Sequence, residues 1–224
     1  MFMARRLDNT RRRLIDAASE LFAARGFHAT TARDIAQRAG ANLAAGNYHY
    51  GSKKELYLEV LRDQFATVGD ALARRGGSKP AAEIARLSRK QALVLLHRRI
   101  AVILDLLIGP RPALHGALMQ REMADPSQAL PIIVREFIRP MSEEMEQIVA
   151  RIAPELSPRE LRRVVMSIIG QAIFYRFAMP AVLAMYDLES FPKGFAADVA
   201  EHVAEFSIGG IDRAARAKRR TRAS

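Results

Sequence analysis

Apolar residues recur at helical spacing along nearly the whole chain. The first such stripe ends at Gly26 and consists of Leu14, Ala18, Leu21 and Phe22. Later segments are bounded in the same way by capping or helix-breaking residues, and no segment of useful length alternates apolar and polar residues as a half-buried strand does. The pattern predicts an all-α protein.

Two short helices joined by a tight turn are predicted after the first helix. Thr31, with Asp34 three residues later, can cap the start of the first of them, which ends at Gly40. Asn42 can then cap the second, over residues 43–50. Two short helices behind a longer one predict a helix-turn-helix at about residues 31–50, whose second helix enters the major groove of DNA.

The second short helix carries side chains that suit this groove. Ala44 and Ala45 are small enough to let the backbone approach base edges, and Asn47 can pair with adenine through two hydrogen bonds. The DNA phosphates can be contacted by Tyr48, His49 and Lys53, the first residue of the next predicted helix. Each residue also has a plain structural alternative: alanines favour helices, Asn47 can face water, and Tyr48 or Tyr50 can belong to the core. Their ordered combination favours DNA binding.

The net charge of +11 lies at the two ends of the chain. Residues 1–55 hold 10 Lys and Arg against 5 Asp and Glu, and residues 213–224 hold 6 against none. The remaining residues are balanced. This distribution indicates a polyanion-binding N-terminal domain and a basic tail over 214–224, which we expect to be disordered. The alternative is that the arginines only keep both ends solvated.

The motifs of this chain resemble those of a known family. TARDIAQRAG followed by ANLAAGNYHYGSKKELY resembles the DNA-binding domain of TetR-family transcriptional regulators over residues 8–68. Further motifs resemble the CecR-like branch of that family: NLAA-x-NYHY, REM at 121–123, Pro126, IRP at 138–140 and IIGQAIFYR at 168–176. The resemblance implies phosphate contacts by Thr31, Tyr48, His49 and Lys53. It implies a base-facing surface formed by Asn42, Ala44, Ala45 and Asn47.

Two residues depart from the family pattern. Gly46 stands where the family has Ile, Leu or Val facing the core. Glycine inside a helix costs about 1 kcal/mol relative to alanine, so we expect a loosely held recognition helix before DNA binds. Tyr50 replaces Phe, which requires a partner or solvent for its hydroxyl.

The rest of the chain is predicted to form a helical bundle over residues 80–213. Its helices are expected at about 81–108, 112–124, 128–152, 158–186 and 194–217. Residues 164–186 are long enough to span a bilayer, but Gln171, Arg176 and Pro180 argue against a membrane span. A helix buried on most faces favours a subunit interface in a twofold dimer.

The resemblance implies the same dimer, formed through the last two long helices, with Ile169 and Ile173 as candidate interface residues. It also implies an effector cavity in this bundle. Candidate lining residues are Met119, Met123, Phe137, Met141, Met166, Phe174 and Phe177. Methionine adapts to irregular ligands, although the same residues can form ordinary core.

Enzyme chemistry has little support in the sequence. The five histidines lack acidic partners at metal-ligand spacing, and no phosphate-binding or nucleophile motif occurs. The chain has no cysteine, which suits a reducing cytoplasm, and its N-terminus lacks the apolar run of a signal peptide. We expect a cytoplasmic, cofactor-free homodimer that represses transcription at a palindromic double-stranded DNA operator and is released by a small, largely apolar effector. The alternative is a helical small-molecule-binding protein or enzyme whose basic ends are incidental.

Overall fold

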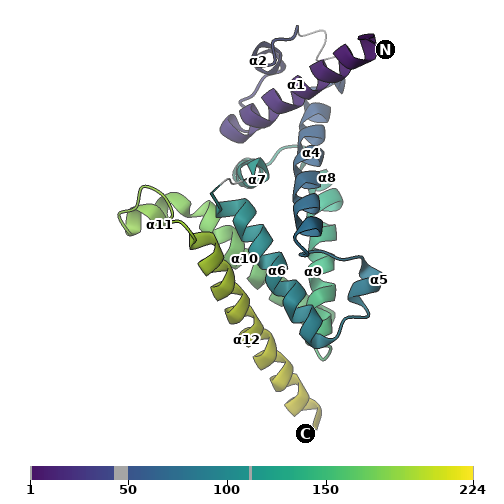
Figure 1. Cartoon of the computed structure of the whole chain (residues 1–224), viewed down its shortest axis with the longest axis vertical. Helices are drawn as coiled ribbons and strands as arrows, with labels where there is room; N and C mark the ends of the chain where they lie inside the picture. The colour runs from purple at the N-terminus through teal and green to yellow at the C-terminus, as the bar shows by residue number, and fades with distance from the viewer. Residues whose placement is uncertain (1, 43–49, 111–112, 224) are drawn as a thin grey trace. The chain divides into compact units, whose positions relative to one another are not determined.

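The chain folds into helices that group into two compact units. The computed structural model describes the backbone of residues 2–42, 50–110 and 113–223, and the elements in these residues are helical (Figure 1), which confirms the all-α prediction. Unit 1 comprises Met1–Thr67 and Ala113–Phe137, and unit 2 comprises Val68–Pro112 and Ile138–Ser224. Unit 1 therefore includes residues beyond the domain predicted at 8–68.

Unit 1 is built around its long first helix. Its helices are α1 (Phe2–Arg25), α2 (Ala32–Arg38), the first part of α4 (Lys53–Arg74), α7 (Leu114–Ala124) and α8 (Leu130–Ile133). The predicted stripe on α1 is buried at Leu14, Ala18 and Phe22. Both α2 and α7 contact α1. The first helix thus provides the surface on which α2 and α7 are assembled.

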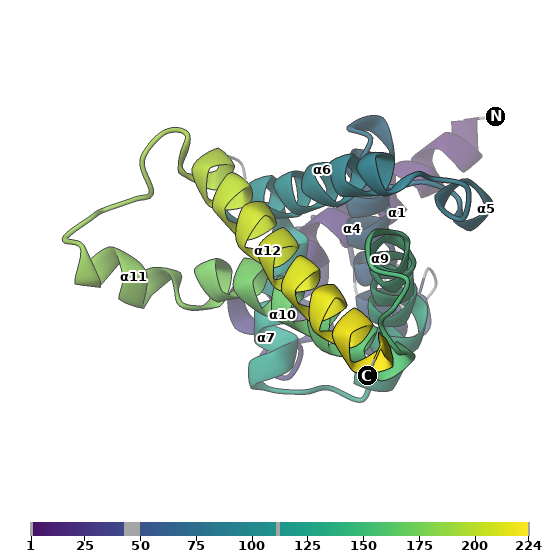
Figure 2. The ribbon, with the colours of Figure 1, turned by 90° about the horizontal axis from the view of Figure 1, so that it is seen from below.

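Unit 2 is a bundle around α6. It contains the end of α4 and the helices α5 (Ala81–Ile84), α6 (Arg89–Ile108), α9 (Arg139–Ile152), α10 (Pro158–Phe177), α11 (Met179–Met185) and α12 (Phe195–Ala223), with a π-helical turn, Val134–Ile138, leading into α9 from unit 1. α6 contacts α9, α10 and α12 (Figure 2). Its buried face includes Leu96, Ile100 and Leu104, which belong to one apolar core with residues of the other three helices.

Two predicted helices are broken in the structure. A capping box between Ser88 and Gln91 starts α6, so the predicted helix at 81–108 is divided. The predicted helix at 158–186 ends at Ala178, and the next helix begins there with Pro180 at its second position, where a missing backbone N–H costs little. In both places a local capping preference interrupts a longer apolar pattern.

Neither a membrane span nor a metal site is found in the described part of the chain. No single helix there is long and apolar enough to cross a membrane, and α10 and α11 pass such a test only as a pair bent by 68°. No group of three or more His, Asp or Glu side chains among these residues is placed to hold a metal ion.

The basic tail differs from its prediction. Residues 214–223, expected to be disordered, continue α12 as far as Ala223. Two cations of this segment form ion pairs: Lys218 Nζ lies 2.8 Å from Glu160 Oε1, and Arg219 Nη1 lies 2.6 Å from Glu155 Oε1. Cations are also favoured at a helix C-terminus by the helix dipole. The prediction of a solvated tail was based on composition, and composition does not show these carboxylate partners.

A buried carboxylate explains why α7 belongs to unit 1. Glu122 on α7 is only 1% exposed, and its Oε2 accepts a hydrogen bond of 2.8 Å from the hydroxyl of Tyr57 on α4. Its Oε1 accepts two more, each 2.9 Å long, from the backbone N–H and the hydroxyl of Ser127. A carboxylate is stable in the interior when its oxygens are satisfied in this way. The pKa of Tyr57 is raised, first by burial and then by its hydrogen bond to Glu122.

A second set of contacts joins the end of α7 to the end of α1. The guanidinium of Arg121 donates a 2.8 Å hydrogen bond to the carbonyl of Ala24. His28 Nε2 lies 3.5 Å from the carbonyl of Pro126. Tyr57 itself packs edge-on against Phe22 of α1, with 4.8 Å between ring centroids. α7 is therefore attached to the helix-turn-helix frame at several points.

We predict that Glu122→Ala destabilises the protein by about 2 to 4 kcal/mol, because it leaves the Tyr57 hydroxyl and the Ser127 N–H unsatisfied in the interior. Glu122→Gln keeps one acceptor oxygen and should cost less. Urea unfolding of the full chain measures both. The matched control is Glu143→Ala at an exposed position, which should change the free energy of unfolding by no more than about 0.5 kcal/mol. Equal effects of the two alanine variants would contradict the role given to Glu122.

We also predict that Lys218→Met raises the pKa of Glu160. That pKa is lowered from 4.5 to about 2, first by the hydrogen bond from Lys218 and then by those from Ser157. Since the pKa is lowered on folding, this stabilisation is present above pH 4.5 and is lost as the pH falls toward 2. A carbon-13 NMR titration of the carboxyl group measures the shift. Lys193→Met, an exposed control, should leave it unchanged. An unshifted titration in Lys218→Met would show that α12 does not hold Glu160.

Candidate DNA-binding site

The start of α2 is fixed by the predicted capping box. Thr31 has an extended backbone, and its hydroxyl oxygen accepts a 3.1 Å hydrogen bond from the N–H of Asp34. The Asp34 carboxylate in turn accepts 3.0 Å and 2.7 Å hydrogen bonds from the N–H and the hydroxyl of Thr31. These bonds lower the pKa of Asp34. The capping prediction is confirmed, and the phosphate contact implied for Thr31 stays a prediction.

Lys53 has partners within its own unit. Its ammonium donates hydrogen bonds to the carbonyls of Phe27, at 2.9 Å, and Thr30, at 3.1 Å. It also lies 4.2 Å from the centroid of the Phe27 ring, within range of a cation–π interaction. Lys53 therefore attaches the start of α4 to the segment between α1 and α2. The phosphate contact implied for it is not tested by these bonds.

Thr30 is a supporting residue that sequence reasoning missed. It is fully buried, and its hydroxyl donates hydrogen bonds to the carbonyls of Gly26, at 2.8 Å, and Leu21, at 3.3 Å. Its own carbonyl accepts from Lys53. Thr30 thus ties the end of α1 to the starts of both α2 and α4. The sequence offered one indication of this role, which is the position of Thr30 next to Thr31. When one of two adjacent threonines caps a helix, the side chain of the other can point into the core.

Tyr50 belongs to the core of unit 1. It is 7% exposed, and its hydroxyl donates a 3.1 Å hydrogen bond to the carbonyl of Arg11. The Arg11 guanidinium lies over its ring, 5.7 Å from the centroid. Burial raises the pKa of Tyr50. The hydroxyl therefore has the partner that a tyrosine requires at a position usually held by phenylalanine.

The residues proposed to read bases fall largely outside the described part of the chain. Asn42 is exposed directly after the turn that follows α2. The remaining candidates lie in the gap at residues 43–49: Ala44, Ala45, Asn47, Tyr48 and His49, together with Gly46. Their proposed roles therefore stay predictions. What the structure shows is the frame on both sides of this segment, formed by α2 before it and by Tyr50 and α4 after it.

Exposed cations lie on α1 and α2. Arg12 pairs with Asp63 and Arg38 pairs with Glu20. Arg13, Arg25 and Arg33 are exposed, and none of them forms an ion pair with a described carboxylate. Positive charge that is not neutralised within the protein is available for phosphates, and it strengthens electrostatic attraction to DNA at low salt.

The seven predicted effector residues are divided between the two units. Met119, Met123 and Phe137 belong to unit 1, and Met141, Met166, Phe174 and Phe177 belong to unit 2. Phe137 stacks on Phe65 of α4, with 4.4 Å between ring centroids. Met166 and Phe174 are 53% and 55% exposed on α10, so they do not line the interior of unit 2 as expected. Helical spacing did not show which face of α10 turns outward.

α10 and α12 present an exposed face that is rich in apolar and small residues. Phe206 on α12 is 67% exposed, and the candidate interface residue Ile173 is 36% exposed. Ile169, the other candidate, is partly buried against the core of unit 2. At Gly170, Gly209 and Gly210 an added Cβ would meet nothing within 4 Å. A hollow of about 280 Å³ lies along this face beside Phe206.

Comparison with known proteins agrees with this geometry. The family described as "Bacterial regulatory proteins, tetR family" matches residues 14–60. The family described as "HTH-type transcriptional dual regulator CecR, C-terminal domain" matches residues 89–211, more than half of the chain. Together the two matches cover the helix-turn-helix region, the undescribed residues 43–49 included, and most of the helices that follow it.

Individual relatives are also transcriptional regulators rather than enzymes. The chain is 27% identical to CecR of Shigella flexneri over 150 residues, 64% of each protein. It is 33% identical to the repressor KstR2 of Rhodococcus jostii over 99 residues, 42% of this chain and 48% of that protein. The chain therefore matches less than two thirds of the length of either relative.

Solved structures share the fold at low sequence identity. A tetR-family regulatory protein from Rhodococcus RHA1 has a TM-score of 0.66 at 19% identity, over 90% of this chain and 96% of that one. FadR of Bacillus subtilis, in complex with stearoyl-CoA, has a TM-score of 0.63 at 15% identity, over 88% of this chain and 97% of that one. The chain belongs to the TetR family of bacterial transcriptional regulators, in the branch defined by the C-terminal domain of CecR.

Proposed function

We propose that the protein is a ligand-responsive repressor that binds a palindromic double-stranded DNA operator as a homodimer. The observation that carries this proposal is the frame around residues 43–49: a capped α2 on one side, and Tyr50 with the anchored start of α4 on the other. A helix-turn-helix requires fixed flanks of this kind on both sides of its second helix. KstR2, one of the relatives, is named as a repressor, and CecR is named as a dual regulator.

Base reading is assigned to the segment that this frame holds. Asn42, Ala44, Ala45 and Asn47 form the base-facing surface, and Thr31, Tyr48, His49 and Lys53 contact phosphates. Support comes from the family match, which extends over these positions, and from the exposed arginines of α1 and α2. Phosphate contacts fix the protein on the duplex, and base contacts supply sequence preference.

The dimer is proposed to form through α10 and α12. Their shared face exposes Phe206, Ile173 and Phe174, which is costly in water, and its glycines let a second helix pair approach closely. A twofold dimer places two recognition helices in successive major grooves, about 34 Å apart. This spacing is why the operator should be an inverted repeat.

Release is proposed to follow binding of a small, largely apolar effector. Support comes from FadR, which has the same fold and was solved with stearoyl-CoA bound. An effector that binds better to one arrangement of the dimer shifts its population toward that arrangement. If the favoured arrangement changes the spacing of the recognition helices, affinity for the operator falls.

The dimer can be tested with Phe206→Asp. We expect the wild type to sediment at about twice its chain mass of 24.9 kDa, and the variant to shift toward monomer because a charge at this position must be desolvated at the interface. Leu188→Asp, at an exposed apolar position outside α10 and α12, is the matched control and should remain dimeric. A wild-type monomer at micromolar concentration would overturn the interface and the palindromic operator together.

DNA binding can be tested with Lys53→Ala and Asn47→Ala at several salt concentrations. Lys53→Ala should weaken binding to operator and to random DNA alike, and should make the slope of log K against log salt shallower by about one unit per subunit. Asn47→Ala should leave the slope unchanged and lose about 1 to 3 kcal/mol of discrimination at one base position in each half-site.

The hydrogen bonds of Lys53 within unit 1 define the result that would contradict a phosphate contact by Lys53. If its ammonium serves only the carbonyls of Phe27 and Thr30, Lys53→Ala lowers the melting temperature and leaves the salt slope as in wild type. Lys193→Ala removes the same charge from an exposed position in unit 2 and is the control for nonspecific attraction.

A further inference from the structure

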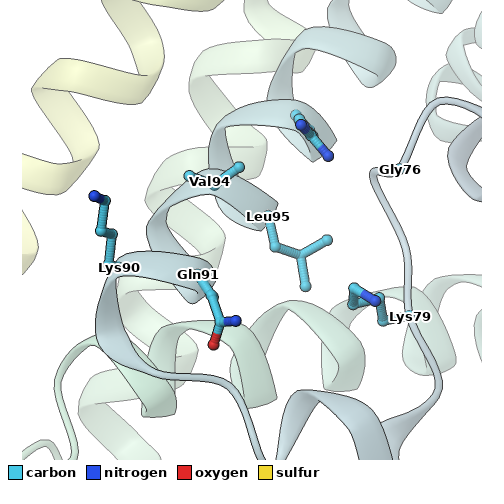
Figure 3. Close-up of a pocket in the computed structure, with 7 residues that line it drawn as sticks. Gly76, Lys79, Lys90, Gln91, Val94 and Leu95 are labelled. Atoms are coloured by element: carbon cyan, nitrogen blue, oxygen red, sulfur yellow. The ribbon is translucent and has the colours of Figure 1, made fainter.

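A small hollow with cationic side chains at its rim lies in unit 2 beside α6 (Figure 3). Its volume is about 270 Å³, and its lining includes Gly76, Lys79, Lys90, Val94, Leu95 and Arg98. It lies between α6 and the segment that joins α4 to α5. In Figure 3, Leu95 points from α6 toward the part of this segment that carries Lys79.

The wall opposite α6 is held in place by a buried ion pair. Arg99 is only 1% exposed, and its guanidinium lies 2.8 Å from the Glu144 carboxylate and donates a 3.2 Å hydrogen bond to the carbonyl of Gly77. The same carboxylate accepts a 2.7 Å hydrogen bond from the Ser78 hydroxyl. Since these bonds fix residues 77 and 78 without any ligand, the hollow is formed in advance and a ligand need not order the segment.

The hollow combines an apolar floor with unbalanced positive charge. Leu95 is 3% exposed, and Val94 is 45% exposed. Lys79 is paired with Glu83 at 2.7 Å, whereas neither Lys90 nor Arg98 forms an ion pair with any described carboxylate.

Arg98 lies against the joining segment. A Cβ placed on Gly76 would come within 3.2 Å of Arg98 Nη1, so the guanidinium is directly over this glycine. Gly76 has a φ of +68°, a conformation that favours glycine. The absence of a side chain here leaves room for the guanidinium at the edge of the hollow, beside the exposed Val94 side chain.

We propose that this hollow binds a small organic anion. A short alkyl or acyl chain lies on Val94 and Leu95, and its carboxylate or phosphate is held by Arg98, with Lys90 adding positive potential. A guanidinium suits both head groups because its planar N–H donors match two oxygens at once. The volume is near the lower limit of ligand pockets, about 300 to 1,000 Å³, which restricts the chain to a few carbons. This site does not depend on the DNA-binding proposal.

The experiment uses full-length protein with labelled valine and leucine methyl groups. Hexanoate, butyl phosphate and the uncharged hexanamide are added in turn and followed by NMR. We expect the Val94 and Leu95 methyl signals to shift to saturation with at least one anion and not with hexanamide. The anion that binds more tightly identifies the head group. Arg98→Gln should weaken that binding by about fivefold or more, and Lys193→Gln, which removes an exposed charge outside the hollow, should not.

Three results would overturn the proposal: shifts that never saturate, equal binding of hexanamide, or unchanged binding by Arg98→Gln. The backbone amide spectrum of each variant shows whether its fold is kept. If Arg98→Gln loses its fold, Lys90→Gln replaces it in the same comparison, because Lys90 lines the hollow without an ion pair to any carboxylate in the described residues. Unchanged binding by Lys90→Gln would then contradict the proposal that cationic side chains at the rim bind the anion.

Discussion

The hydrogen bond from Tyr57 to Glu122 decides which helices belong to the DNA-binding unit. A buried carboxylate is tolerated only when its oxygens are satisfied, and Glu122 meets this condition through Tyr57 and Ser127. Moving α7 away from α4 would leave the Tyr57 hydroxyl without its partner. A displacement of α7 would therefore disturb α4, the helix that begins at Lys53.

Local features of the fold could be predicted from the sequence, and long-range ones could not. Thr31 with Asp34 marks a helix start by neighbouring residues alone, and the structure has that start. The link between Tyr57 and Glu122 joins residues 65 positions apart, so no periodicity reveals it. The basic tail was misjudged for the same reason, since Lys218 is held by a carboxylate on another helix.

The candidate site shows the same division. Sequence reasoning selected Lys53 as a member of the site and stated that the Tyr50 hydroxyl needed a partner or solvent. It could not supply that partner, the carbonyl of Arg11, nor foresee that the Lys53 ammonium binds two carbonyls. Residue type and spacing predict which groups meet DNA. The contacts of their side chains depend on how α1, α2 and α4 pack.

Selection of genomic DNA by the purified full-length protein tests the account most directly. Fragments retained at moderate salt would be sequenced and aligned. The account predicts that they share one inverted repeat with half-sites about one helical turn apart, because two related recognition helices must meet successive major grooves. Retained fragments without any shared sequence, or with a single unrepeated site, would contradict a dimeric operator-binding regulator.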